Sequence, residues 1–137
     1  MSTSFRCAVM TPEGASFDGE VTYASFPAWD GQYGVMAGMA PVLDRLGIGH
    51  LRLDTAKGTR WFSVEEGFAH VRDNTLTILS EAVHALEDLS IGELESALKA
   101  FESADHSDLS ADEQNSQRIR MTSKLRLAQT HRGDRVA

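Results

Sequence analysis

The amino-acid composition changes abruptly near residue 85, and this change restricts the folds open to the chain. All three prolines, nine of eleven glycines and nine of ten aromatic residues precede residue 85. Ala, Leu, Glu, Ser, Gln and Arg dominate the sequence after it. Composition typical of strands and turns is therefore followed by composition typical of helices. We place a boundary at Val83–Leu89, which gives a β domain over residues 1–85 and a helical domain over residues 86–137.

The first part has the pattern of short strands separated by turns. Phe5, Cys7 and Val9 alternate with Arg6, Ala8 and Met10, as in a half-buried strand. Turn signals recur at about 8 to 12 residues. They are Thr11–Gly14, a second bend within Phe17–Val21, and two hairpin turns at Ala56–Gly58 and Asp73–Asn74. This spacing predicts an antiparallel β-sandwich or barrel.

The stretch from Pro27 to Pro41 combines three glycines with apolar residues. A loop normally has less apolar surface, and a strand normally has less glycine. We expect a folded-over connection with a tight turn at Asp30-Gly31, in which glycines supply unusual backbone angles. Val35, Met36 and Met39 would be either buried or exposed to a partner. A glycine-kinked pair of strands that merely packs explains the stretch equally well.

The second part carries two helix-start signals. Ser90–Glu93 and Ser110–Glu113 both match the capping box, in which the serine hydroxyl accepts a free backbone N–H. A short polar turn at Asp105–Asp108 predicts that the two helices are antiparallel neighbours. Apolar stripes are expected on both helices. They are Ile91, Leu94, Leu98 and Phe101 on the first, and Met121, Leu125 and Ala128 on the second.

Charge is distributed unevenly between the two helices. Residues 85–113 contain nine acids and one base, whereas residues 118–137 contain six bases and one acid. We expect the bases Arg118, Arg120, Lys124 and Arg126 to lie near the acids Glu93, Glu95 and Glu102. Such exposed pairs give only about 0.2–1 kcal/mol each, so the hairpin could close, dock elsewhere or open.

Several functional classes are disfavoured. The net charge of −7 argues against a nucleic-acid partner. No apolar run approaches the ~20 residues that cross a bilayer, so direct membrane insertion is not expected. The histidines and Cys7 have no ligand-like spacing, so we predict no metal site and no cofactor. Cys7 should be buried, His70 should lie on the surface, and Glu65-Glu66 should form a solvated strand end. The sequence favours an interaction protein over an enzyme.

An ordered set of motifs resembles the epsilon subunit of F-type ATP synthases. The motifs are Thr11-Pro12-Glu13-Gly14, Phe17, Gly19-Glu20-Val21, Asp30-Gly31, Gly34-Val35, Gly38, Ala40-Pro41, Gly67-Phe68-Ala69 and Asn74 with Leu76–Leu79. Because a two-helix tail after an all-β N-terminal domain completes the match, the resemblance covers nearly the whole chain.

The resemblance implies an α+β protein, with a sandwich of about ten strands followed by a two-helix hairpin. It implies a non-catalytic rotor subunit of the central stalk, which links the gamma subunit to the c ring and couples proton flow to ATP synthesis. The hairpin can reach the alpha/beta catalytic head and restrain ATP hydrolysis. The implied location is the cytoplasmic face of a bacterial membrane, as a peripheral part of the complex.

The resemblance also assigns residues to two surfaces. The c-ring contact loop would comprise Asp30, Gly31, Gln32, Gly34, Val35, Gly38, Met39, Ala40 and Pro41. The regulatory hairpin would act through Ile91, Glu93, Leu94, Leu98, Phe101, Arg118, Arg120, Lys124 and Arg126.

Three residues depart from the family pattern. Met39 stands where relatives usually have histidine, and Gln32 stands where they are often acidic. Glu93 stands where ATP-binding relatives have the arginine of an Ile-Asp-x-x-Arg motif, which disfavours phosphate binding. The competing hypothesis is a stand-alone adaptor or a small-ligand-binding protein on the same sandwich, because fold alone does not determine function.

Overall fold

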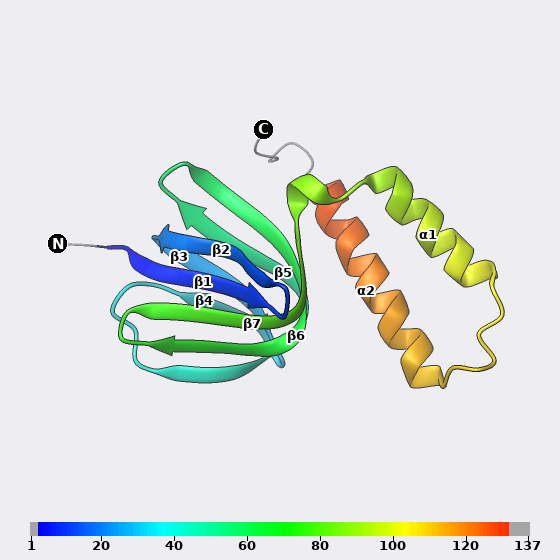
Figure 1. Cartoon of the computed structure of the whole chain (residues 1–137), viewed down its shortest axis with the longest axis horizontal. Helices are drawn as coiled ribbons and strands as arrows, with labels where there is room; N and C mark the ends of the chain where they lie inside the picture. Colours follow the sequence, from blue (N-terminus) through cyan, green and yellow to red (C-terminus); the bar gives the residue numbers. More distant parts are fainter. Residues whose placement is uncertain (1–2, 132–137) are drawn as a thin grey trace.

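A computed structural model describes residues 3–131. A β-sandwich and a helical hairpin lie side by side in it (Figure 1). Seven strands form one continuous sheet in the order β2-β1-β7-β6-β5-β3-β4. The strands are β1 (Phe5–Thr11), β2 (Gly14–Val21), β3 (Tyr23–Ala28), β4 (Gly31–Val35), β5 (Val42–Thr55), β6 (Gly58–Arg72) and β7 (Thr75–Ala85). The predicted combination of a sandwich and a two-helix hairpin is confirmed.

The strand count differs from the expected ten because three strands are unusually long. β5, β6 and β7 contain 14, 15 and 11 residues, whereas a typical strand has about 5–6. The prediction of purely antiparallel pairing was also wrong, because β1 pairs with β7 in parallel. The remaining pairs in the sheet are antiparallel.

Most predicted turns are confirmed. Asp73 and Asn74 connect β6 to β7 with φ of 51° and 57°, values that asparagine and aspartate tolerate better than most residues. Ala56 and Lys57 connect β5 to β6 between the paired residues Thr55 and Gly58, and here the positive φ, 122°, falls on Gly58. The bend expected within Phe17–Val21 was wrong, because β2 runs through to Val21 against β1.

The sandwich encloses one apolar core. Phe5, Cys7 and Val9 are all buried, as their alternation predicted. Burial raises the pKa of the Cys7 thiol to about 12, which leaves it protonated and unreactive. Other fully buried side chains include Phe26, Leu51, Leu53, Phe62, Leu76 and Ile78.

Two helices follow the short 3₁₀ turn η1 (Leu86–Asp88). Helix α1 spans Ile91–Ser103 and α2 spans Ala111–Thr130. Ser90 and Ser110 cap them, and each hydroxyl accepts the backbone N–H three residues on, from Glu93 and Glu113. The expected stripe on α1 is confirmed, since Phe101 is buried and Ile91, Leu94 and Leu98 are half-buried.

Helix α2 lies between α1 and the sandwich (Figure 1). It packs on the outer side of β5 and β6. A second, small apolar cluster forms where α2 meets the linker, and its buried members are Leu86, Leu89, Leu127 and Ala128. This cluster joins the C-terminal end of α2 to the segment from which the hairpin begins.

Candidate functional site

The segment expected to be one loop, Asp30–Pro41, is two turns with a strand between them. Trp29 and Asp30 form a turn, and Gly31 with φ of 136° begins β4 opposite Ala28. The connection to β5 occupies residues 36–41. Five residues of extended strand span roughly 17 Å, so Asp30 and Gly38 lie at opposite ends of β4. The predicted tight turn at Asp30-Gly31 is confirmed, whereas Gly31–Val35 form strand β4 and not part of a loop.

Residues 36–41 lie at the end of the sandwich that points away from the helices (Figure 1). Asn74 links three segments there, because its Oδ1 accepts the N–H of Gly38 at 3.0 Å and its Nδ2 donates to the Ser4 carbonyl at 3.0 Å. Gly38 has φ of 80°, where a side chain would be strained. Met36 is 61% exposed, Met39 packs partly against the core, and Val35 is buried.

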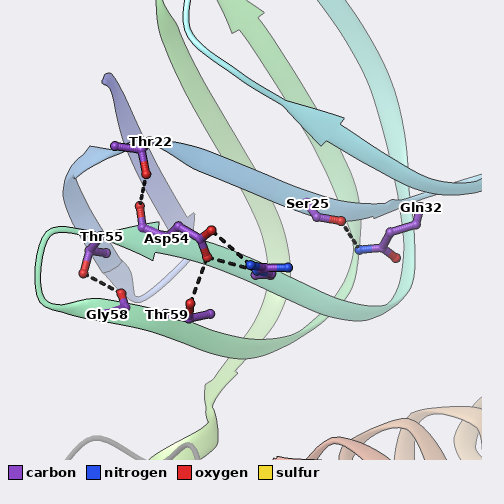
Figure 2. A network of polar contacts seen from close by, with 8 residues as sticks. Thr22, Ser25, Gln32, Asp54, Thr55, Gly58 and Thr59 are labelled. Carbon is purple, nitrogen blue, oxygen red and sulfur yellow. Dashed lines mark hydrogen bonds and ion pairs between the residues drawn. The ribbon is translucent and has the colours of Figure 1, made fainter. Parts of the chain in front are cut away.

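Two residues of the predicted contact loop have packing roles instead. Gln32 Nε2 donates to Ser25 Oγ at 2.8 Å, as Figure 2 shows, and to the His50 carbonyl at 3.0 Å. Gly34 lacks a positive φ, but a Cβ at this position would lie 2.8 Å from the Tyr23 hydroxyl. Gln32 and Gly34 thus contribute to packing within the sandwich, and both are also exposed.

The outer face of β5, β6 and β7 carries an exposed apolar patch, formed by Leu43, Phe68 and Leu79. These side chains are 70%, 51% and 52% exposed. Phe68 lies directly opposite Leu79 on the neighbouring strand. Because Ala69 and Val71 point into the core, Phe68 points outward. Exposed apolar side chains gathered in this way are typical of a binding surface.

A β-bulge in β6 separates this apolar patch from the helices. Glu66 has φ of 52° and Gly67 has φ of 128°, and a Cβ on Gly67 would lie 1.9 Å from the Leu79 carbonyl oxygen. Ser80 closes the bulge, since its hydroxyl donates to the Glu65 carbonyl at 2.9 Å. The bulge re-aims the strand, and Glu65 lies on the side that α2 covers.

The prediction that Glu65-Glu66 is a solvated strand end was wrong for Glu65. This residue is 8% exposed. Its carboxylate oxygens lie 3.1 Å from Arg120 Nε and 3.5 Å from Lys124 Nζ, and the exposed Glu66 lies 3.4 Å from Arg120 Nη2. Gly67 indicates the bulge in the sequence, but the burial of Glu65 depends on α2, which lies far along the chain.

The bases of α2 therefore do not all pair with the acids of α1. Arg118 lies 3.7 Å from Glu102 as expected, whereas Arg120 and Lys124 pair with the sandwich. Arg126 lines a cleft of about 450 Å³ between α2 and the sandwich. The reason is packing: α2 presents these bases to β5 and β6, and not to α1.

Further contacts, both polar and aromatic, complete the junction between the sandwich and the hairpin. His50 Nε2 lies 2.9 Å from the Ser123 carbonyl oxygen. Trp61 stacks on His131 with ring centroids 3.8 Å apart, and the Arg52 guanidinium lies 6.0 Å from the Trp61 ring. Asp54 holds Arg52 through two bonds of 2.9 and 3.1 Å and also accepts from Thr59 at 3.0 Å (Figure 2).

Residues 3–131 contain no cluster of three or more possible metal ligands. Within the same residues, no helix is long and apolar enough to cross a membrane. His70 is exposed on β6, as its alternation predicted. Among the described residues, three surfaces are notable: the end formed by residues 36–41, the apolar patch and the junction beneath α2.

Comparison with known proteins identifies the chain's relatives. Residues 4–85 match the model of the beta-sandwich domain of the ATP synthase delta/epsilon chain. The chain belongs to this family. Among curated relatives, the ATP synthase epsilon chain of Rhodopirellula baltica is 43% identical over 77 residues, which are 56% of this chain and 60% of that relative. The epsilon chain of Nitratidesulfovibrio vulgaris is 34% identical over 100 residues, 73% of this chain and 72% of the relative.

Solved structures agree on the fold. A chain in the mitochondrial ATP synthase of Euglena gracilis, determined with OSCP, F1 and the c-ring, has a TM-score of 0.71 at 20% identity and aligns over 98% of this chain and 82% of its own. A chain in the central stalk and c-ring of the Tetrahymena thermophila enzyme has a TM-score of 0.59 at 18% identity, over 91% of this chain and 93% of its own.

As a member of this family, the chain is a non-catalytic subunit of ATP synthase. The resemblance seen in the sequence is confirmed, and family membership favours it over a stand-alone adaptor. The polar contacts beneath α2, above all those of Glu65 and His50, are not evident from the sequence. His50 carries no local signal, since its role depends on a helix 73 residues further along the chain.

Proposed function

We propose that the sandwich links the gamma subunit to the c ring, and that the hairpin restrains ATP hydrolysis by the alpha/beta head. The observation that carries this proposal is the separation of surfaces on one rigid sandwich. The apolar patch lies on an outer face, the exposed turn at residues 36–41 lies at one end, and α2 of the hairpin packs on β5 and β6. A component that transmits rotation needs more than one binding surface on a body that does not deform.

The apolar patch is the proposed contact with gamma. Leu43, Phe68 and Leu79 lie on paired strands of the continuous sheet, so their relative positions are rigid. A permanent partner would bury their exposed area and gain about 25 cal/mol for each Å² removed from water. The patch also lies beyond the bulge from α2, so gamma and the docked hairpin can occupy this face together.

The end formed by residues 36–41 is the proposed contact with the c ring. From the predicted loop, this assignment keeps Gly38, Met39, Ala40 and Pro41 and adds Met36. It omits Asp30, Gly31, Gln32, Gly34 and Val35, since these residues form a distant turn or pack within the sandwich. Contact with the ring would place the chain at the membrane surface, as a peripheral part of the complex.

Two substitutions that introduce a negative charge test the two surfaces separately. Phe68→Asp should prevent co-purification with gamma, and Met36→Asp should leave gamma bound but abolish proton-driven synthesis while the soluble head still hydrolyses ATP. Ala56→Asp, in an exposed turn outside both surfaces, is the matched control. Wild-type coupling in the Met36 variant would refute the assignment of residues 36–41 to the c ring. Retention of gamma by the Phe68 variant would refute the assignment of the apolar patch to gamma.

The hairpin is the proposed restraint on hydrolysis. The middle of α2 is held by polar contacts, so a partner with an acidic surface can compete for its bases. Deleting residues 90–137 should leave synthesis largely intact and raise ATP hydrolysis by the assembled enzyme. Equal hydrolysis by the truncated and full-length enzymes at several salt concentrations would exclude this role.

A further inference from the structure

A row of three polar residues crosses the sandwich beneath α2. His50 on β5 lies opposite Ser63 on β6, and Ser63 lies opposite His84 on β7. Directly opposed residues on antiparallel strands point to the same face. That face is outside the core, because Phe62 and Val64 on either side of Ser63 point inward. Within the described residues, Ser63 Oγ and His84 Nδ1 are buried without a hydrogen-bond partner.

His50 makes the bond that crosses from this row to the helix. Its Nε2 lies 2.9 Å from the backbone carbonyl oxygen of Ser123. A carbonyl can only accept, so Nε2 must carry the proton and donate it. In the neutral ring, Nδ1 is then bare and a second proton would be added there. Gln32 fixes the backbone of the same residue by donating to the His50 carbonyl at 3.0 Å.

The charges around His50 are predominantly positive. Arg126 and His131 act on it from α2 and from the residue that follows it. Arg118 lines the same cleft. Glu65, on the adjacent strand, is the nearby carboxylate, but Arg120 and Lys124 already pair with it. The titratable and charged groups near this region include Arg52 and its partner Asp54 on β5, Glu65 and Glu66 on β6, His84 on β7, Arg118, Arg120, Lys124 and Arg126 on α2, and His131.

We propose that His50 is a proton-sensitive latch, in which protonation of its ring weakens the docking of α2 on the sandwich. A second proton would place a full charge in a half-buried site whose cleft is also lined by the guanidinium groups of Arg118 and Arg126. Undocking relieves this repulsion and returns the ring to water. The latch is a property of the chain itself and does not depend on the proposed restraint of hydrolysis.

The direction of the pH effect follows from the pKa of His50. Burial lowers this pKa below its usual value, the bond to Ser123 opposes the shift, and His131 and Arg126 lower it further. The docked state therefore binds the proton less readily than the undocked state, whose pKa should return toward about 6.5. Docking is strongest above that value and weakens as the pH falls through the lower, docked pKa.

Energy transfer between two dyes on the full-length chain would measure docking. Cysteines replace the exposed residues Lys57 in the sandwich and Gln117 on α2, and the buried Cys7 is not labelled. Between about pH 8 and pH 5, the ratio of docked to undocked chains should fall several-fold. Each unit of difference between the docked and undocked pKa of His50 changes this ratio by up to about tenfold. His50→Gln can still donate to Ser123 but does not titrate, so its ratio should stay constant.

Matched variants make the result decisive. His70→Gln, at an exposed position on β6, should behave as the wild type. Arg126→Gln keeps the latch bond and removes an opposing charge, so it should show a smaller pH effect even if the His50 variant folds poorly. The proposal is overturned if wild-type docking is independent of pH, if His50→Gln keeps the full pH effect, or if His84→Gln is the variant that loses it.

Discussion

The interior of the sandwich and the junction beneath α2 are stabilised by different kinds of interaction. Within residues 3–131, seventeen buried apolar residues form the sandwich core, whereas four form the cluster where α2 meets the linker. The middle of α2 contacts the sandwich instead through ion pairs at Glu65 and the bond from His50. Apolar burial is cumulative and insensitive to salt, whereas ion pairs depend on their partners and on ionic strength.

This difference separates permanent structure from reversible contact. A body that transmits torque must keep its shape, and the sandwich has the core to do so. A helix that changes partners must be able to leave without exposing a large apolar surface. The small cluster at Leu127 and Ala128 is suited to act as a pivot, because it sits next to the linker and anchors one end of α2.

The largest effect is expected at the bulge, with Gly67→Ala. A Cβ there would lie 1.9 Å from the Leu79 carbonyl oxygen at φ of 128°, so the backbone must move. We expect a loss of about 3 kcal/mol or more in the free energy of unfolding, measured with urea. Gly58→Ala is the control, because Gly58 has φ of 122° but open space around it, and it should lose only about 1 kcal/mol. Equal losses would mean that contact with Leu79 does not matter.

The next effect is expected at the junction, with Glu65→Gln. The change leaves Arg120 and Lys124 facing a neutral group and should weaken docking of α2 by about 2 kcal/mol. Amide hydrogen exchange should show faster exchange in α2 and unchanged protection in β1 and β7. Glu81→Gln, at an exposed position on β7, is the control. Loss of protection throughout the sandwich would show that the two regions are not separable.

The sequence predicts those parts of the fold that are determined locally. The turn at Asp73-Asn74 needs residues that tolerate positive φ, and the helix starts at Ser90 and Ser110 need a hydroxyl acceptor. Each signal lies within a few residues, so composition and spacing reveal it. The change of composition near residue 85 likewise corresponds to the end of β7 at Ala85.

Features that depend on distant partners could not be predicted in this way. Alternation cannot reveal that β5 and β6 continue through the whole sandwich, because Gly47 and Gly49 interrupt the pattern. A Cβ on Gly49 would lie 2.7 Å from Pro27 Cβ, a contact between different strands. Glu65 resembles a surface acid until α2 covers it. The contact surfaces for gamma and the c ring stay predictions.

A smaller effect is expected at the cap of α2, with Ser110→Ala. The Ser110 hydroxyl accepts the N–H of Glu113 at 3.1 Å, and loss of a serine cap costs about 1 kcal/mol. Hydrogen exchange should increase in the first turn of α2, while contacts at Glu65 persist. Ser107→Ala, in the connecting turn, is the control. If fraying spread through α2 and released it from the sandwich, the polar junction would be weaker than we infer.

The smallest effect is expected at the contact between the two helices, with Arg118→Gln. Arg118 lies 3.7 Å from Glu102, and the two side chains are 45% and 56% exposed. Water screens such a pair, so its loss should change stability by about 0.5 kcal/mol or less, and by still less at high salt. The guanidinium also lies 5.7 Å from the Phe101 ring, a contact that the exposed position keeps weak. Hydrogen exchange of α1 should therefore hardly change, in contrast to the response of α2 to Glu65→Gln. If Arg118→Gln released the hairpin as strongly, then pairing between the helices, rather than docking on the sandwich, would hold the tail in place.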